Sequence, residues 1–190
     1  MQAADSTGAP PARPAGYATL LVPVLIGGLV AITIGVYGHL HTPTGVAVNL
    51  AGFSSPLTVK VWLASVSATL ALVQLVSALA MYGRLPKVRA PSWIGGLHRW
   101  SGRAAFLVAV PVAVHCLYAL GLQFSDPRTL LHSLAGCLFF GAFTAKMLLL
   151  PKPGLPGWAL PIAGAVTFTA LVVLWLTSSL WFFSTSGFKL

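Results

Sequence analysis

Long apolar runs and short polar stretches alternate along this chain. Each run is close to the roughly 20 residues that an α-helix needs to cross a bilayer. Aromatic residues gather near the ends of the runs, as they do where helices meet the membrane interface. The pattern predicts five membrane-spanning helices, at residues 17–38, 61–83, 98–122, 129–150 and 158–184.

Composition supports a membrane protein. Of the 190 residues, 57% are hydrophobic and 7% are charged, whereas roughly a quarter of the residues of a soluble domain are charged. We expect an all-α integral membrane bundle, with one five-helix domain over residues 17–184. Residues 1–16, rich in Ala, Pro and Gly, are expected to be a disordered tail, and residues 185–190 a short C-terminal tail.

The basic residues indicate topology, because they fall in short segments at the ends of the apolar runs. The net charge is +9. Cytoplasmic loops of membrane proteins are enriched in Lys and Arg, so we expect the N-terminus inside, the C-terminus outside, and no nucleic-acid partner. One set of helix ends holds Arg13, Arg84, Lys87, Arg89, Arg99, Arg103, Lys146 and Lys152, and the other holds Lys60, Arg128 and Lys189.

The longest connection, residues 39–60, carries His39 and His41 and mixes apolar with small residues. We expect it to lie outside and to pack over the helix ends. The two cysteines, Cys116 and Cys137, fall inside apolar runs and are expected to be small core residues. No CxxCH sequence is present, so covalent c-type haem attachment is not indicated.

Three histidines, His98, His115 and His132, carry the candidate chemistry. They lie in or at the ends of two neighbouring apolar runs. Because an imidazole without a partner is costly in a bilayer, an intramembrane histidine indicates a functional site. Histidines that face each other across helices commonly bind a haem iron.

Two of these histidines are expected to lie at a similar depth along the membrane normal. With a helix rise of about 1.5 Å per residue, His115 lies roughly 8 Å, and His132 roughly 11 Å, to the outer side of the midplane. Both could bind one haem iron as axial ligands. His98 lies roughly 17 Å to the other side, where Met81 and Met147 are the candidate partners for a second site.

Both HxxxG patterns place a glycine on the same helix face as a histidine, Gly102 with His98 and Gly136 with His132. Each glycine either leaves room for a planar ring or lets neighbouring helices approach closely. Arg128, one turn before His132, is expected to pair with a haem propionate or else to anchor the helix end.

Two further residues affect the helices around these histidines. Pro111, four residues before His115, is expected to bend its helix. Gln74, a single amide in the middle of the second run, is expected either to hydrogen-bond across helices or to approach the cofactor.

The segments LHRWSGR and LHSLAG, separated by an intrahelical histidine, resemble transmembrane b-type cytochromes. The similarity covers residues 96–137, and the nearest families are the ascorbate-reducing diheme cytochromes and the ferric-reductase-like transmembrane domains. The resemblance implies non-covalent haem b held by histidines of neighbouring helices. The second and fifth runs contain no histidine, so a complete two-haem core is not expected, and a flavin or nicotinamide domain is not expected either.

Together these patterns predict a multi-pass protein of a cell membrane. The composition favours a prokaryotic plasma membrane. It would hold at least one haem b, with His115 and His132 as axial ligands. It would carry electrons from a quinol or a protein donor in the membrane to an acceptor outside, alone or as the haem subunit of an oxidoreductase. Homo- or hetero-oligomers are compatible with the sequence. The alternative is a haem-free anchor or assembly subunit of a respiratory complex.

Overall fold

The computed structural model describes residues 17–87 and 89–190, and the expected disordered tail at 1–16 lies outside this part. Five of its helical stretches are long and apolar enough to span a membrane, so the expected all-α multi-pass fold is confirmed. These stretches are α1 (Tyr17–Leu40), α2 (Pro56–Met81), α3 (Ile94–Val114) with η1 (His115–Leu120), α4 (Pro127–Leu149), and α5 (Ala159–Trp175) with η2 (Leu176–Leu180) and α6 (Trp181–Ser186).

Helices α2, α3 and α4 begin earlier than the apolar pattern predicts, and polar caps extend two of them, α2 and α4. Ser55 caps α2 and Asp126 caps α4, and in each case a threonine three residues later completes a reciprocal capping box. A proline follows each cap, where its missing N–H costs nothing. The caps satisfy backbone donors that would otherwise be unpaired at the membrane boundary.

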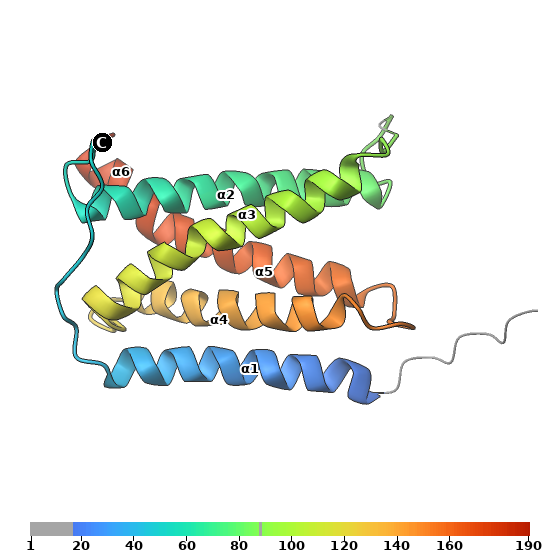
Figure 1. Cartoon of the computed structure of the whole chain (residues 1–190), viewed down its shortest axis with the longest axis horizontal. Coiled ribbons are helices and arrows are strands. Elements are labelled where there is room, and N and C mark those ends of the chain that lie inside the picture. The colour runs from blue at the N-terminus through green and yellow to red at the C-terminus, as the bar shows by residue number, and fades with distance from the viewer. Residues whose placement is uncertain (1–16, 88) are drawn as a thin grey trace, which may run out of the picture.

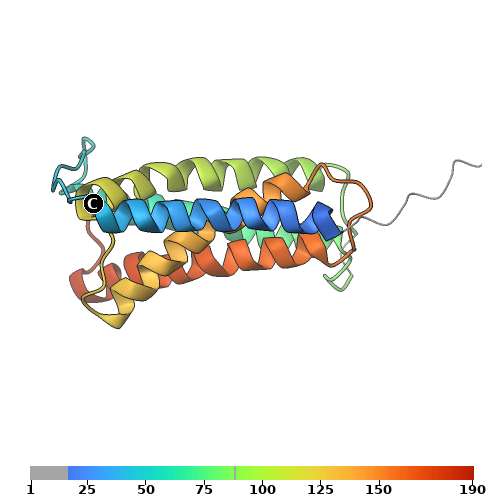
Figure 2. The ribbon, with the colours of Figure 1, turned by 90° about the horizontal axis from the view of Figure 1, so that it is seen from below.

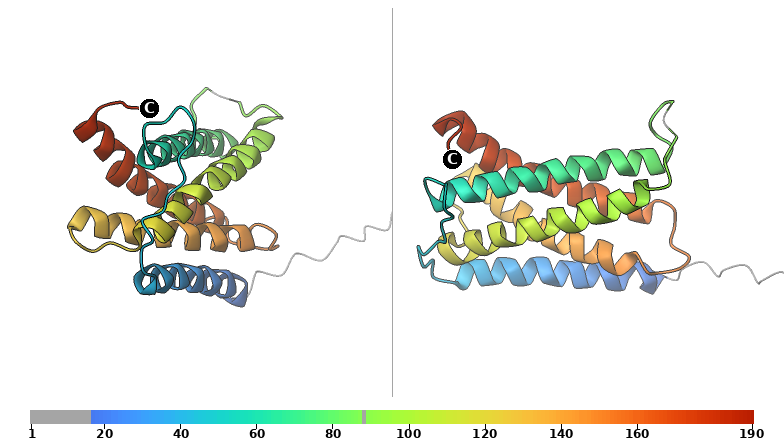
Figure 3. Two further views of the ribbon diagram at one scale, coloured as in Figure 1. Left: turned by 60° about the vertical axis from the view of Figure 1, so that its left-hand side comes forward. Right: turned by 45° about the horizontal axis from the view of Figure 1, so that its top comes forward.

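The long helices lie side by side as an elongated bundle, with α1 at one edge (Figures 1 and 2). Helix α1 packs along α4, α2 along α3, and α4 along α5. Helix α3 runs obliquely, from the α2 side at its start towards the α4 side at its end (Figures 1 and 3). Although α3 and α4 are consecutive, they are not a closely packed pair, and this leaves space between them.

Glycines set the contact between α1 and α4. A Cβ on Gly27 would lie 2.5 Å from the carbonyl oxygen of Gly141, and a Cβ on Gly141 would lie 2.5 Å from the carbonyl oxygen of Gly27. Any side chain at either position would therefore push the two backbones apart. This is the close approach that small residues permit between membrane helices.

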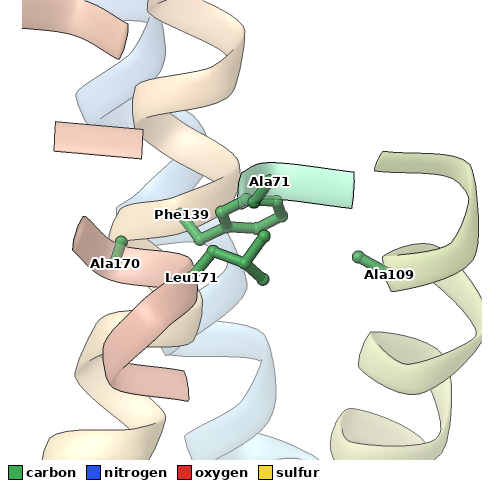
Figure 4. Close-up of a cluster of buried hydrophobic side chains, with 5 residues drawn as sticks. All are labelled: Ala71, Ala109, Phe139, Ala170 and Leu171. Atoms are coloured by element: carbon green, nitrogen blue, oxygen red, sulfur yellow. The ribbon is translucent and has the colours of Figure 1, made fainter. Parts of the chain in front are cut away.

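Many buried residues are small, and many large apolar side chains face outward. Ser67 and Ser179 are fully buried, whereas Leu25 is 67% exposed and Ile32 is 64% exposed. This distribution suits a bundle surrounded by lipid, where apolar exposure is not penalised. One buried apolar cluster joins four helices near mid-height (Figure 4), and it consists of Ala71, Ala109, Phe139, Ala170 and Leu171.

For clarity, the two ends of the bundle are named by their histidines. The His132 end holds residues 41–55, residues 121–126 and the C-terminus, and the His98 end holds residues 82–93 and 150–158. Both π-helical segments, η1 and η2, lie towards the His132 end. Helix α3 continues through Pro111 and changes to π-helical hydrogen bonding four residues later. Such π segments occur frequently at functional sites.

The connection between α1 and α2 packs over the His132 end, as expected. The backbone N–H groups of Thr44 and Gly45 donate to the carbonyls of Tyr118 and Ala119 in η1. The His41 ring stacks between Tyr37 and Tyr118, with centroid distances of 5.1 and 5.3 Å. These contacts connect the end of α1 to η1.

Candidate functional site

A cavity of about 290 Å³ opens between the helices at the His132 end. Helices α2, α3, α4 and α5 with their π segments form its walls, and α1 contributes Ile34. Its volume is close to the lower limit for small-molecule sites. The lining side chains that can hydrogen-bond, carry charge or bind a metal are Lys60, Cys116, Gln123, Arg128, His132, Cys137, Thr177 and Trp181.

His132 is held in one orientation by Thr177. The imidazole Nδ1 lies 2.9 Å from the hydroxyl oxygen of Thr177, and that hydroxyl donates to the carbonyl oxygen of Val173 at 2.7 Å. When the Thr177 hydroxyl gives its one proton to the Val173 carbonyl, its oxygen accepts from His132 Nδ1–H. In that neutral tautomer, Nδ1 carries the proton and Nε2 keeps a free lone pair.

A lone pair on Nε2, with Nδ1 fixed by a hydrogen bond, is the arrangement of a metal-ligating histidine. The side chain lines the cavity, so the free lone pair belongs to a group that a ligand can reach. Sequence reasoning did not identify Thr177, which lies 45 positions away on another helix.

Gly136 keeps the wall beside His132 open. A Cβ added there would meet only Leu174, at an ordinary 3.8 Å, and Gly136 lines the cavity. The two cysteines also line the cavity, one from η1 and one from α4, and both are free thiols. They are therefore wall residues of the site rather than members of the buried apolar cluster.

Arg128 lies on the same cavity wall as His132, as the four-residue spacing predicts. Its Nη1 donates to the carbonyl oxygen of Thr177 at 2.7 Å, and the guanidinium lies 4.0 Å from the ring centroid of Trp181. Asp126 caps the same helix. The hydrogen bonds from Thr129, and a further one from the Arg128 N–H, hold the pKa of that carboxyl below its usual value.

His115, the expected second ligand, lies on a face of its helix that does not border the cavity. It begins η1 and is half-buried, yet it is not among the residues that line the cavity. Its neighbour Cys116 lines the cavity instead, together with Val112 and Ala113 one turn earlier. The structure therefore does not bring His115 and His132 to one surface.

His98 repeats the hydrogen-bond arrangement of His132 at the opposite end. Its Nδ1 lies 2.9 Å from the hydroxyl of Ser77, and that hydroxyl donates to the carbonyl of Val73 at 2.6 Å. The surroundings differ, however. Gln74 donates to the His98 carbonyl and to Ser101 Oγ, so this amide bonds across helices, the first of its two expected roles.

Gly102 makes room for Gln74. A Cβ on Gly102 would lie 2.8 Å from Oε1 of that side chain. The Gln74 side chain thus fills the space beside Gly102. Of the two expected roles of this glycine, the structure supports close helix packing. Across residues 17–87 and 89–190, no cluster of three or more His, Cys, Asp or Glu residues could hold a metal ion, so a bare polynuclear or carboxylate metal site is not indicated there.

Comparison with known proteins gives one family. No curated protein and no solved structure matches the chain. A family of unknown function, DUF6529, matches residues 20–190 and so covers all five membrane-spanning helices. The chain belongs to the DUF6529 family.

Proposed function

We propose that this protein is a membrane b-type cytochrome that binds non-covalent haem b in the cavity at the His132 end. The observation that carries the proposal is the imidazole of His132. It lines the cavity, and the Thr177–Val173 hydrogen-bond chain leaves its Nε2 free to bind iron. An intramembrane histidine oriented in this way needs a partner, and a metal ion supplies one.

The rest of the cavity lining suits the chemistry of haem, because it combines apolar side chains with cations. Gly136 leaves the wall beside His132 open, and apolar side chains such as Leu171 and Phe140 would contact the macrocycle. Arg128 is a cation one turn from His132 and would pair with a propionate. These residues supply one axial nitrogen, an apolar slot and a counter-charge.

His115 is proposed as the second axial ligand, as its depth predicts. It lies outside the cavity wall in this structure, so ligation requires the η1 segment to turn it towards α4. The π-helical hydrogen bonds of His115–Leu120 mark a place where the helical register already departs from α. If η1 does not turn, His132 would be the one histidine of the cavity wall that could hold the haem.

When bound, a bis-histidine haem supplies reversible one-electron transfer. The chain's own residues would orient the ligand imidazole, exclude water and balance propionate charge. The proposed role is electron transfer from a quinol or protein donor in a prokaryotic plasma membrane to an acceptor on the outer side. The lipid bilayer is the solvent for the apolar faces of all five long helices.

Absorption spectroscopy tests the proposal directly. The protein would be purified in mild detergent from haem-replete cells, and the pyridine haemochrome and reduced-minus-oxidised spectra recorded. We expect about one b-type haem per chain, released by acid acetone because no CxxCH sequence tethers it. A colourless protein would contradict the proposal and favour the haem-free anchor or assembly subunit.

The spin state separates the two coordination schemes. With both histidines bound, the ferric haem is low-spin, and His115→Ala converts it to high-spin haem that stays bound through His132. A low-spin spectrum unchanged by His115→Ala would remove His115 from the site while leaving His132 in place.

A further inference from the structure

Two cations from different helices line the cavity at the His132 end. Lys60 comes from the second turn of α2, and Arg128 from the first turn of α4. Sequence reasoning treated Lys60 only as a charge that reports topology. The structure places it on the wall of the same cavity as His132.

No acidic side chain among the described residues lines this cavity. Asp126, the one acidic residue in the described part of the chain, is outside the lining. Its carboxylate already accepts hydrogen bonds from the N–H groups of Arg128 and Thr129 and from the Thr129 hydroxyl. The two cations therefore share a partly enclosed space without an anionic side chain, an arrangement that an anionic ligand stabilises.

Arg128 is positioned before any ligand binds. One of its N–H groups donates to Thr177, and its guanidinium stacks on Trp181. Guanidinium has five N–H donors, so others remain for a ligand. A carboxylate can accept two of them in parallel, which makes arginine suited to this group.

The cavity is polar at its mouth and apolar at its base. Gln123 and Ser133, which hydrogen-bond to each other, line the mouth near Arg128. Ala109, Phe139 and Leu171, members of the buried cluster in Figure 4, line the base. A matching ligand has an apolar body and anionic groups at one end.

We propose that Lys60 and Arg128 form a paired clamp that binds the two carboxylates of a porphyrin and so fixes the end of the ring that faces the cavity mouth. This inference rests on the proposed haem site, which it extends by making Lys60 a ligand-positioning residue. The clamp acts on charge alone, so it can be measured without iron.

The test uses the full-length protein produced without haem supply and placed in nanodiscs of neutral lipid. Binding of iron-free protoporphyrin IX and of its dimethyl ester is followed by quenching of tryptophan fluorescence. We expect the diacid to bind about tenfold or more tightly than the ester, since hydrogen bonds to charged groups contribute roughly 1.5–3 kcal/mol. Equal binding of diacid and ester, or binding of neither, would overturn the clamp.

Variants assign the preference to Lys60. Lys60→Met should reduce the diacid preference severalfold, and Lys60→Arg should retain it, which also shows that position 60 tolerates change. Lys152→Met is the matched control, because Lys152 is an exposed lysine at the opposite end, and it should bind as wild type does. A diacid preference unchanged in Lys60→Met would exclude Lys60 from the clamp.

Two further results separate this inference from the proposed function. A low-spin haem spectrum that requires His132, together with no diacid preference, would keep the cytochrome and overturn the clamp. A diacid preference without any iron coordination by His132 would keep the clamp and overturn the cytochrome. Loss of the diacid preference in nanodiscs containing phosphatidylglycerol would assign the cations to a lipid phosphate and overturn the clamp.

Discussion

His98 and His132 have the same local chemistry at opposite ends of the bundle, but their surroundings differ. In each case the imidazole Nδ1 lies 2.9 Å from a hydroxyl oxygen of a neighbouring helix, and that hydroxyl is within hydrogen-bond distance of a carbonyl four residues earlier in its own helix. At the His132 end the nearby glycine borders a cavity. At the His98 end the nearby glycine is covered by Gln74.

The difference shows that an oriented imidazole does not by itself make a site. At His98 the space a ligand would need is occupied by an amide that hydrogen-bonds two helices together. At His132 the space beside the glycine meets only Leu174, at an ordinary 3.8 Å, and it borders a cavity whose lining includes two cations. The HxxxG pattern is therefore compatible with both helix packing and ligand binding, and the partner of the glycine decides between them.

The largest contrast is expected from leucine substitutions at the two glycines. Gly102→Leu should destabilise the protein by roughly 1–3 kcal/mol, because it displaces Gln74 and leaves buried polar groups unpaired. Gly136→Leu should leave the stability close to wild type but block haem uptake, because the side chain enters the cavity. Thermal unfolding and haem content measure the two effects. Equal haem loss in both variants, at equal stability, would contradict the different roles given to Gly102 and Gly136.

Removing each hydroxyl partner should separate the two histidines further. Thr177→Val leaves the His132 Nδ1–H unpaired and should weaken haem binding about 10–100-fold, the usual effect of losing such a partner. Ser77→Ala is the matched change at His98 and should lower stability without altering haem affinity. Competitive transfer of haem to apomyoglobin gives the affinities. Similar haem affinities in the two variants would contradict the assignment.

A smaller effect is expected on the redox potential. Arg128→Gln removes a cation near the proposed propionate and should lower the midpoint potential, since a nearby cation favours the less positive, reduced haem. The shift should be on the order of 1 kcal/mol for a partly exposed pair. Arg84→Gln, at the His98 end, should leave the potential unchanged. A raised potential in Arg128→Gln, with haem still bound, would place the propionates elsewhere.

The smallest expected effect is a pH dependence at the α4 cap. Because the pKa of Asp126 is lowered in the folded state, its contribution to stability is present above its unfolded pKa of about 4 and is lost as the pH falls through the lower folded value. The protection of amides at the start of α4, measured as the exchange rate relative to the intrinsic rate at the same pH, should therefore decrease below about pH 4. Asp126→Asn should abolish this acid dependence, and persistence of the dependence in that variant would assign it to another group.

Most of the fold could be predicted from the sequence, because lipid requires long apolar helices and the chain shows five. The starts of α2 and α4 were placed too late. Their cap signals, Ser55-Pro56 and Asp126-Pro127, are visible in the sequence, but threonine takes the position where glutamate or glutamine is usual in a capping box.

The candidate site could be predicted only in part. Arg128, His132 and Gly136 share a face because they are four residues apart on one helix, and the structure confirms that all three line one cavity. Depth along the helix placed His115 at a similar level, but depth does not determine the direction in which a side chain points. The partners Thr177 and Lys60 come from other helices, so only the packing of the bundle could identify them.

Haem content in a matched pair of histidine variants tests the central claim most directly. Wild type, His132→Ala and His98→Ala would be purified from the same haem-replete cells, and haem per chain determined by pyridine haemochrome at equal, verified folding. The account predicts that His132→Ala loses its haem while His98→Ala keeps about one haem per chain. Full haem content in His132→Ala, or loss only in His98→Ala, would contradict it.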